Sequence, residues 1–168
     1  VAFAGIAVYI SFRYDRRYAF LALVALAHDV VIVCGIFAWL GVFFQLEVDS
    51  LFAVALLTIA GYSVNDTVVV FDRIRERTQQ GSDLPLKLQV DQAVSATLTR
   101  TLYTSGTTLM PLLALVFFGG ATLYWFAIAL AIGVVVGSWS SIALAPSLLT
   151  LWEPQGDYAA DESQATIA

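Results

Sequence analysis

Apolar residues fill five consecutive stretches of the chain, at residues 1–12, 18–43, 50–71, 94–118 and 122–152. A helix needs about 20 predominantly apolar residues to cross the hydrocarbon core of a bilayer, and four of the stretches reach that length. The first stretch is too short, so we interpret it as the end of a helix whose beginning lies upstream. The pattern predicts an all-α membrane protein, a bundle of about five transmembrane helices of which the first is truncated.

The composition agrees with a membrane protein. The chain has 168 residues, of which 60% are hydrophobic and 12% charged, whereas soluble domains carry about 25% charged residues. An ordinary water-soluble domain is therefore excluded. Cys34 is the only cysteine in the sequence, so no intrachain disulfide can form. The sequence has no nucleotide-binding loop and no zinc-ligand spacing, and we predict neither a cofactor nor a metal.

Basic residues mark one side of the predicted membrane. Lys and Arg in short loops favour the cytoplasmic side, and the connections at 45–49 and 119–120 contain neither. We therefore predict that the first end of the chain lies outside and the C-terminus in the cytoplasm. Residues 1–152 form the predicted bundle and residues 153–168 a flexible, acidic cytoplasmic tail. Because topology accounts for the basic loop residues, the sequence predicts no nucleic-acid partner. These residues are Arg13, Arg16, Arg17, Arg73, Arg75, Arg77 and Lys87.

An ionisable residue interrupts the third apolar stretch. Asp66 follows Tyr62, Ser63 and Asn65 in the run 56–77. On insertion scales, a carboxylate in the middle of a membrane helix makes the free energy of insertion less favourable by about 2.5–3.5 kcal/mol. Each Leu, Ile, Val or Phe makes it more favourable by only about 0.3–0.6 kcal/mol. Intramembrane carboxylates usually mark ion or substrate pathways, so Asp66 is the leading functional candidate.

Arg100 is the predicted partner of Asp66. Asp66 lies six residues before Asp72, near the cytoplasmic end of its helix, and Arg100 lies six residues beyond the expected start of the next span at Val94. Six helical residues rise about 9 Å, so the two charges match in depth on antiparallel neighbours. Opposite charges at one depth stabilise each other in a low dielectric, which predicts a buried ion pair. The alternative to a functional pair is a static structural one.

Further polar groups extend this pair into a predicted polar seam. Tyr62 and Ser63 precede Asp66 by about one helical turn, and Thr104 follows Arg100 by one turn. Each of these residues shares a helix face with its charged neighbour. The run around Arg100, SATLTRTLYTSGTT, is rich in hydroxyl groups. Its polar face is therefore expected to line protein or water and not lipid.

A second group of ionisable residues, His28 and Asp29, lies near the middle of the second stretch. Asp29 is interpreted either as a proton-relay group or as an anchor for hydrogen bonds between helices. His28 is the only histidine in the sequence, and a packing role is favoured over a relay role. Both residues are added to the predicted polar seam.

Glycine and proline positions predict how the last spans pack. Gly133 and Gly137 have a spacing that lets helix backbones approach closely, and packing within the bundle is favoured over a dimer face. Pro111 and Pro146 are each expected to bend a helix or to end a regular turn. Residues 79–90 are either a short helix on the inner membrane surface or the solvated start of the fourth span.

Four segments together resemble one protein family. They are AHD at 27–29, GYSVNDTVVVFDRIRE at 61–76, SATLTRTLYTS at 95–105 and FGGATLYWFAIALAIGVVVGSWSS at 118–141. Over about residues 1–152 the chain resembles the SecF-type subunits of the SecD/SecF protein-export family, within the wider RND transporter superfamily. The resemblance implies that the five stretches correspond to the second to sixth spans of that family's membrane bundle.

The resemblance also implies a function and partners. SecF-type subunits act with SecD at the SecYEG translocon, with YajC and YidC as further associates, in the bacterial cytoplasmic (inner) membrane. They use the proton-motive force to help draw a translocating polypeptide outward. In these terms Asp66 matches the membrane carboxylate implicated in proton movement, Arg100 the arginine across from it, and Asp29 the acidic position of a His-Asp pair. Membrane lipids are the remaining partners, and no enzymatic activity is implied.

Two other functions stay open on the sequence alone. An RND-like proton-coupled exporter of small molecules or lipids needs a substrate cavity of its own. A structural or assembly subunit would work without an ionisable Asp66. An intramembrane enzyme is disfavoured, because the chain has no GxGD segment, no zinc-ligand spacing and no serine with a positioned base.

Overall fold

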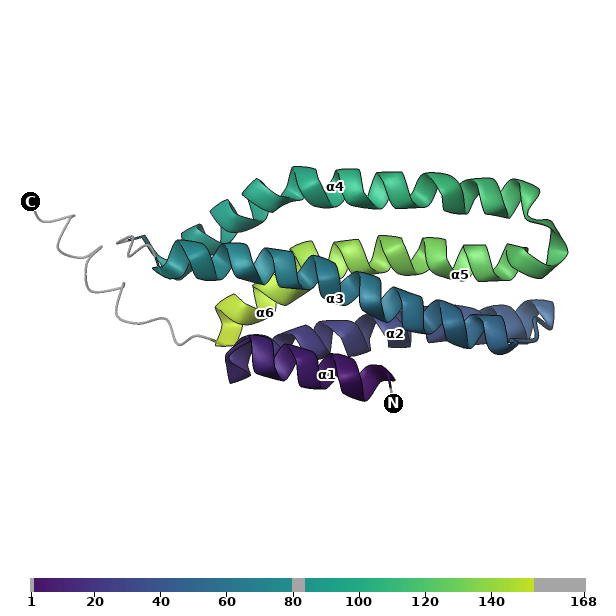
Figure 1. Ribbon diagram of the computed structural model, residues 1–168, viewed down its shortest axis with the longest axis horizontal. Helices are drawn as coiled ribbons and strands as arrows, with labels where there is room; N and C mark the ends of the chain where they lie inside the picture. Colours follow the sequence, from purple (N-terminus) through teal and green to yellow (C-terminus); the bar gives the residue numbers. More distant parts are fainter. Residues whose placement is uncertain (1, 80–83, 153–168) are drawn as a thin grey trace, which may run out of the picture.

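The computed structural model describes residues 2–79 and 84–152, which are almost entirely helical. This confirms the predicted all-α class, whereas the predicted acidic tail at 153–168 lies outside the described residues. The long helices run side by side, with α4 and α1 at opposite edges of the bundle (Figure 1). The elements are α1 (Ala2–Arg13), α2 (Arg16–Phe44), α3 (Ser50–Gln79), α4 (Leu86–Phe118), α5 (Gly120–Trp139), the π-helical turn η1 (Ser140–Leu144) and α6 (Ala145–Trp152).

Four helical segments in the described part of the chain are long and apolar enough to cross a membrane. They are α2, α3, α4 and the continuous run of α5, η1 and α6. The first predicted stretch, 1–12, corresponds to α1, a shorter apolar helix of 12 residues. α3 is the central helix, since it packs against α1, α2, α4 and α5.

α4 begins before the apolar stretch that predicted it. It starts at Leu86 and runs unbroken to Phe118, a length of 33 residues. Of the two interpretations of the preceding segment, the described residues therefore favour the solvated start of the span over a separate surface helix; residues 80–83 lie outside the described part. At 1.5 Å per residue α4 is about 50 Å long, well beyond the hydrocarbon thickness of about 30 Å.

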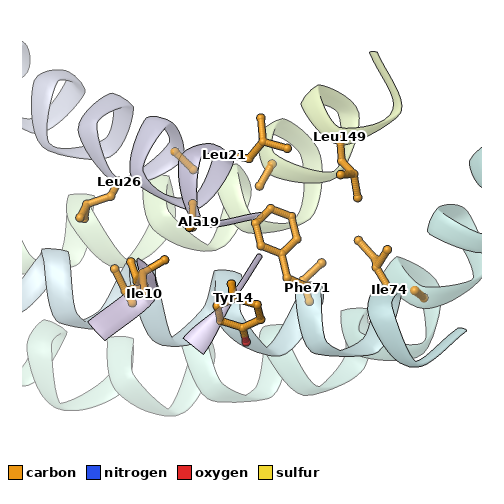
Figure 2. Packing of buried hydrophobic residues seen from close by; sticks show 14 of the residues in the cluster. Ile10, Tyr14, Ala19, Leu21, Leu26, Phe71, Ile74 and Leu149 are labelled. Atoms are coloured by element: carbon orange, nitrogen blue, oxygen red, sulfur yellow. The ribbon is translucent and has the colours of Figure 1, made fainter. Parts of the chain in front are cut away.

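One cluster of buried apolar side chains, the Phe71 cluster, joins α1, α2, α3, α4 and α6 at the end of the bundle that carries the basic residues. Figure 2 shows the ring of Phe71 surrounded by side chains from several of these helices. Because lipid is as apolar as these side chains, van der Waals packing and not removal from water holds them together within the membrane. The core of the cluster includes Ile10, Tyr14, Ala19, Leu21, Leu26, Phe71, Ile74, Val90 and Leu149.

A second cluster, the Ile59 cluster, lies toward the other end of the bundle. It draws on α2, α3, α4 and α5 and contains Val33, Phe37, Ala55, Ile59, Leu112, Ala129, Leu130 and Val134. A Cβ atom added to Gly133 would clash with the side chain of Ile59, and one added to Gly137 would lie 3.2 Å from Cβ of Ser63. The two glycines therefore let α5 pack tightly on α3, in agreement with the predicted packing inside the bundle.

The turn η1 ends at Leu144, two residues before Pro146. The backbone N–H of Ala145 donates to the carbonyl of Ser140, five residues earlier, which widens the helix by one residue at this point. Proline has no N–H to continue the ladder, so the irregular turn lies where Pro146 was expected to disturb the helix. Pro111 lies inside α4, which continues beyond it to Phe118.

The connection between α1 and α2 is fastened to α3. The hydroxyl of Tyr14 donates to the carbonyl of Val68 at 3.1 Å, and Arg13 forms an ion pair with Asp72 at 3.4 Å. Burial and the nearby Asp72 carboxylate both raise the pKa of Tyr14, because each disfavours the phenolate. Tyr14 therefore stays neutral and remains a hydrogen-bond donor.

Candidate functional site

Buried polar side chains form a layer between the two apolar clusters. On α2, α4 and the α5–α6 segment these residues separate the members of the Ile59 cluster from those of the Phe71 cluster. Buried polar groups require hydrogen-bond partners, so their contacts show how the helices are joined. We call this set the polar layer; it consists of Asp29, Ser63, Asp66, Thr67, Thr101, Ser105, Ser138, Ser140 and Ser141.

Asp29 is fully buried and occupies a fully satisfied site where three elements meet. Its Oδ2 accepts hydrogen bonds from Ser63 of α3 at 2.5 Å and from Ser140 of η1 at 2.7 Å. Its Oδ1 lies 3.0 Å from Nδ1 of His28. A buried carboxylate is stabilised by such charge-assisted hydrogen bonds, so the Asp29 site ties α2 to α3 and η1.

Asp66 is also buried, with 6% of its surface exposed, but its site is only partly satisfied. Thr101 of α4 donates to Oδ1 at 3.2 Å. Oδ2 is buried and, within the described residues, has no hydrogen-bond partner. Leaving a buried polar atom unsatisfied costs about 1–3 kcal/mol, and more when the group is charged. The Asp66 site therefore holds a carboxyl oxygen with the capacity to take up a proton.

The predicted buried ion pair between Asp66 and Arg100 is not formed, and this prediction is wrong for the packing described here. Arg100 is exposed, and the ion pairs among the described residues do not include it. Its charge is nevertheless near enough to act on the Asp66 carboxylate. The residue that α4 presents to Asp66 is the next one in the sequence, Thr101.

The orientation of α4 about its own axis explains why the ion pair between Asp66 and Arg100 is not formed. The predicted seam used the face with Arg100 and Thr104, but the hydroxyl of Thr104 donates to the carbonyl of Arg100 in its own helix. The buried face is instead made by Thr97, Thr101 and Ser105, which follow one another at intervals of four residues. Residues four apart share a helix face, so the interval between these three hydroxyl residues was a sequence signal for the buried face of α4.

The other predicted site residues divide between two sides of α3. Ser63 contacts Asp29 and not Asp66, whereas the hydroxyl of Tyr62 donates to Ser105 of α4 at 3.3 Å. Asn65 is exposed and lines a depression between α1 and α3. The ring of His28 is half-buried and lies beside Trp139, with centroids 6.4 Å apart. Sequence spacing thus identified polar residues correctly but not which neighbour each one faces.

Three serines of the SWSS segment belong to the polar layer but were absent from the predicted site. Ser138 lies 2.5 Å from the hydroxyl of Ser105, and Ser141 lies 2.9 Å from that of Thr67. Together with Ser140 they connect the last span to α2, α3 and α4. Three hydroxyls within four positions of an apolar run were an available signal, since polar groups often join helices in membranes. The described residues contain no group of His, Cys, Asp and Glu that could hold a metal ion.

The comparison with a family profile decides the classification. The family described as "Protein export membrane protein SecD/SecF, C-terminal" matches residues 1–155. The chain belongs to the SecD/SecF family. Together with the apolar helices, this makes it a multi-pass membrane protein.

Several relatives carry the name SecF or SecDF. "Protein translocase subunit SecF" of Prochlorococcus marinus is 74% identical over 151 residues, which are 90% of this chain and 47% of that protein. The protein of the same name from Synechocystis sp. is 48% identical and is matched over 48% of its length. "Protein translocase subunit SecDF" of Thermus thermophilus is 43% identical over 88% of this chain and 20% of its own. The chain thus spans about half the length of the SecF relatives.

A solved structure of a SecDF protein confirms the fold. The crystal structure described as "SecDF in Super-membrane-facing form" superposes with a TM-score of 0.82 at 40% sequence identity. The match covers 99% of this chain and 22% of that one. The arrangement of α1 to α6 is therefore the membrane architecture found in a SecDF protein.

Proposed function

We propose that this chain is the helical bundle of an accessory subunit of the Sec protein-export machinery, which acts with SecD and uses the proton-motive force to promote export. Membership of the SecD/SecF family and the translocase names of its relatives support the proposal. The joint name SecDF of one relative supports SecD as the partner. SecYEG, YajC and YidC are included on the resemblance alone, and the proposal assigns the chain no catalytic step.

The proposal places residues 1–152 in the bacterial inner membrane, with the first end outside and the C-terminal side in the cytoplasm. The ion pair between Arg13 and Asp72 supports a common side for the α1–α2 connection and the end of α3. These are the two regions that hold most of the basic residues. Their enrichment in Lys and Arg favours the cytoplasmic side.

The observation that carries the proposal is the unsatisfied Oδ2 of Asp66 within a membrane-spanning helix. A proton on this oxygen neutralises a charge that the surrounding low dielectric disfavours. The protonated and ionised forms therefore prefer different surroundings. A helix packing that suits one form suits the other less, which is the condition for coupling proton uptake to movement.

The proton-motive force is large enough for such coupling. One elementary charge crossing 100 mV releases about 2.3 kcal/mol. Because about 1.4 kcal/mol changes an equilibrium tenfold, one proton shifts the balance between two helix packings by more than an order of magnitude. Asp66 takes the proton in this proposal, Arg100 acts on it electrostatically, and Asp29 is the second carboxylate of the pathway.

Proton flux into vesicles tests the proposal. The full-length protein with its SecD partner is reconstituted, and Asp66→Asn is compared with the parent. We expect flux to fall to the level of protein-free vesicles, because Asn cannot take up the proton. Asp91→Asn on the exposed face of α4 is the matched control and should conduct like the parent. Parental flux and parental protein export in Asp66→Asn would instead favour a structural subunit.

A further inference from the structure

The π-helical turn η1 places two adjacent serine hydroxyls in the middle of the polar layer. Ser140 and Ser141 are both fully buried. Single π-helical turns inside longer helices are rare and frequently occur at functional sites. The two hydroxyls of this turn are therefore candidates for a functional role.

Each of the two serines contacts a different part of the layer. Ser140 donates to Oδ2 of Asp29 at 2.7 Å, and the hydroxyl of Ser141 lies 2.9 Å from that of Thr67. Ser141 also donates to the backbone carbonyl of Gly137 at 2.8 Å, and the single hydroxyl hydrogen of Ser140 is shared between Asp29 and this same carbonyl, which lies 3.1 Å away. The two side chains thus share an acceptor, and a change in the hydrogen bond of one alters the acceptor available to the other.

Thr67 extends this set of contacts toward Asp66. It is the neighbour of Asp66 in the sequence, and the two side chains face different helices: Thr67 contacts η1 and Asp66 contacts Thr101 of α4. A displacement of α3 at this point moves both contacts together. A continuous set of contacts therefore runs from Asp29 through η1 to the part of α3 that holds Asp66.

We propose that Ser140 and Ser141 are positioning residues that couple the Asp29 site to the Asp66 site, so that a change in the hydrogen bonds of Asp29 alters proton uptake at Asp66. The inference rests on the proposed function, since it concerns the proton-dependent step of the same site. It adds a defined link, the hydrogen bond between Ser141 and Thr67, that can be removed without touching either carboxylate.

The charged surroundings of the two carboxylates are simple. Among the described residues, His28 is the ionisable side chain in contact with Asp29, and Arg100 is the charged side chain that acts on Asp66. The segment 120–144, which includes η1, contains no Asp, Glu, Lys, Arg or His, so it contributes hydroxyl groups and no charge to the polar layer. Removing a hydroxyl from η1 therefore leaves the net charge around both carboxylates unchanged.

The pH dependence of proton flux provides the test, with the full-length protein and its SecD partner in vesicles. In the parent, Asp29→Asn should change the proton concentration for half-maximal flux by about fivefold or more, the lower end of typical couplings between sites. With Thr67→Val or Ser141→Ala present, the same change should produce less than about a twofold shift. Ser140→Ala should reduce the response in the same way. Because Thr67→Val and Ser141→Ala remove one shared hydrogen bond, their combination should behave like either alone.

The controls separate this inference from a general loss of structure. Thr58→Val changes a threonine of the same helix whose hydroxyl donates to the carbonyl of Val54, and it should leave the response to Asp29→Asn intact. Thr67→Val keeps the shape of the side chain, so it serves as the test if Ser141→Ala fails to fold. An undiminished response in Thr67→Val overturns the coupling, as does the absence of a response in the parent. In contrast, proton flux at the parental level in Asp66→Asn would contradict the proposed function itself.

Discussion

The two buried carboxylates of this bundle occupy opposite kinds of site. Asp29 has hydroxyl donors from two neighbouring elements and a histidine beside it, whereas Asp66 has one donor and an unsatisfied oxygen. Both are similarly buried, so burial alone does not distinguish them. The number of partners does: a fully satisfied carboxylate holds helices together, and a partly satisfied one is suited to change its protonation state.

Among the changes predicted here, replacing the two carboxylates should give the largest difference in stability between the two sites. Asp29→Ala deletes two charge-assisted hydrogen bonds and leaves the hydroxyl of Ser63 without its acceptor, so we expect a loss of about 3 kcal/mol in the free energy of unfolding. Asp66→Ala deletes one bond and an unsatisfied oxygen, and we expect a loss of about 1 kcal/mol or less. Unfolding in mixed detergent and denaturant measures both.

Asp91→Ala, on the exposed face of α4, controls for the loss of an acidic side chain and should be nearly neutral. Equal losses for Asp29→Ala and Asp66→Ala would show that the two sites are not different in kind.

The close approach of α5 to α3 brings η1 to the Asp29 site, and Gly133→Ala should disturb this approach. The added methyl group meets the side chain of Ile59, so we expect a loss of about 2 kcal/mol from overpacking. The double variant Gly133→Ala with Ile59→Ala should lose less than the sum of the two single variants, because the added methyl group no longer meets the side chain of Ile59. Gly106→Ala on α4 has open space around the added group and should cost nothing. A neutral Gly133→Ala would mean that this contact does not hold the polar layer together.

The hydroxyl donors of the two carboxylates should show the same contrast on a smaller scale. Ser63→Ala removes the 2.5 Å hydrogen bond to Asp29, and we expect a loss of about 1.5 kcal/mol. Thr101→Val removes the longer bond of 3.2 Å to Asp66 and should cost about 0.5–1 kcal/mol. The same unfolding assay ranks the two variants, and a greater loss for Thr101→Val would reverse the comparison.

The helices themselves were largely predictable from the sequence. The second apolar stretch, 18–43, corresponds closely to α2 (Arg16–Phe44). The third apolar stretch ends at Phe71, whereas α3 continues to Gln79. Apolar character marks the part of a helix that lies in the membrane and not the end of the helix, because polar residues such as those after Phe71 are also compatible with helix.

The site was predictable as a set of residues but not as a set of contacts. Asp29, Ser63 and Asp66 were found because polar residues in an apolar run are conspicuous. The partner of Asp66 was misassigned, because Arg100 and Thr101 are adjacent and lie about 100° apart around α4. In a helix with hydroxyl groups on several faces, sequence pattern does not fix that rotation. The contribution of η1 was missed because the direction of Ser140 and Ser141 depends on an irregular turn.

The length of α4 has a mechanical consequence. Its 33 residues extend about 20 Å beyond a hydrocarbon layer of about 30 Å, and at the end with the basic residues Arg77 of α3 donates to Gln92 of α4 at 3.3 Å. This hydrogen bond joins the two helices outside the most apolar part of α4. If α4 tilts slightly about Thr101, where it contacts Asp66, the ends of α4 move sideways much further than the residues near Thr101. Under the proposed function, a proton taken up at Asp66 would therefore displace whatever rests against the ends of α3 and α4.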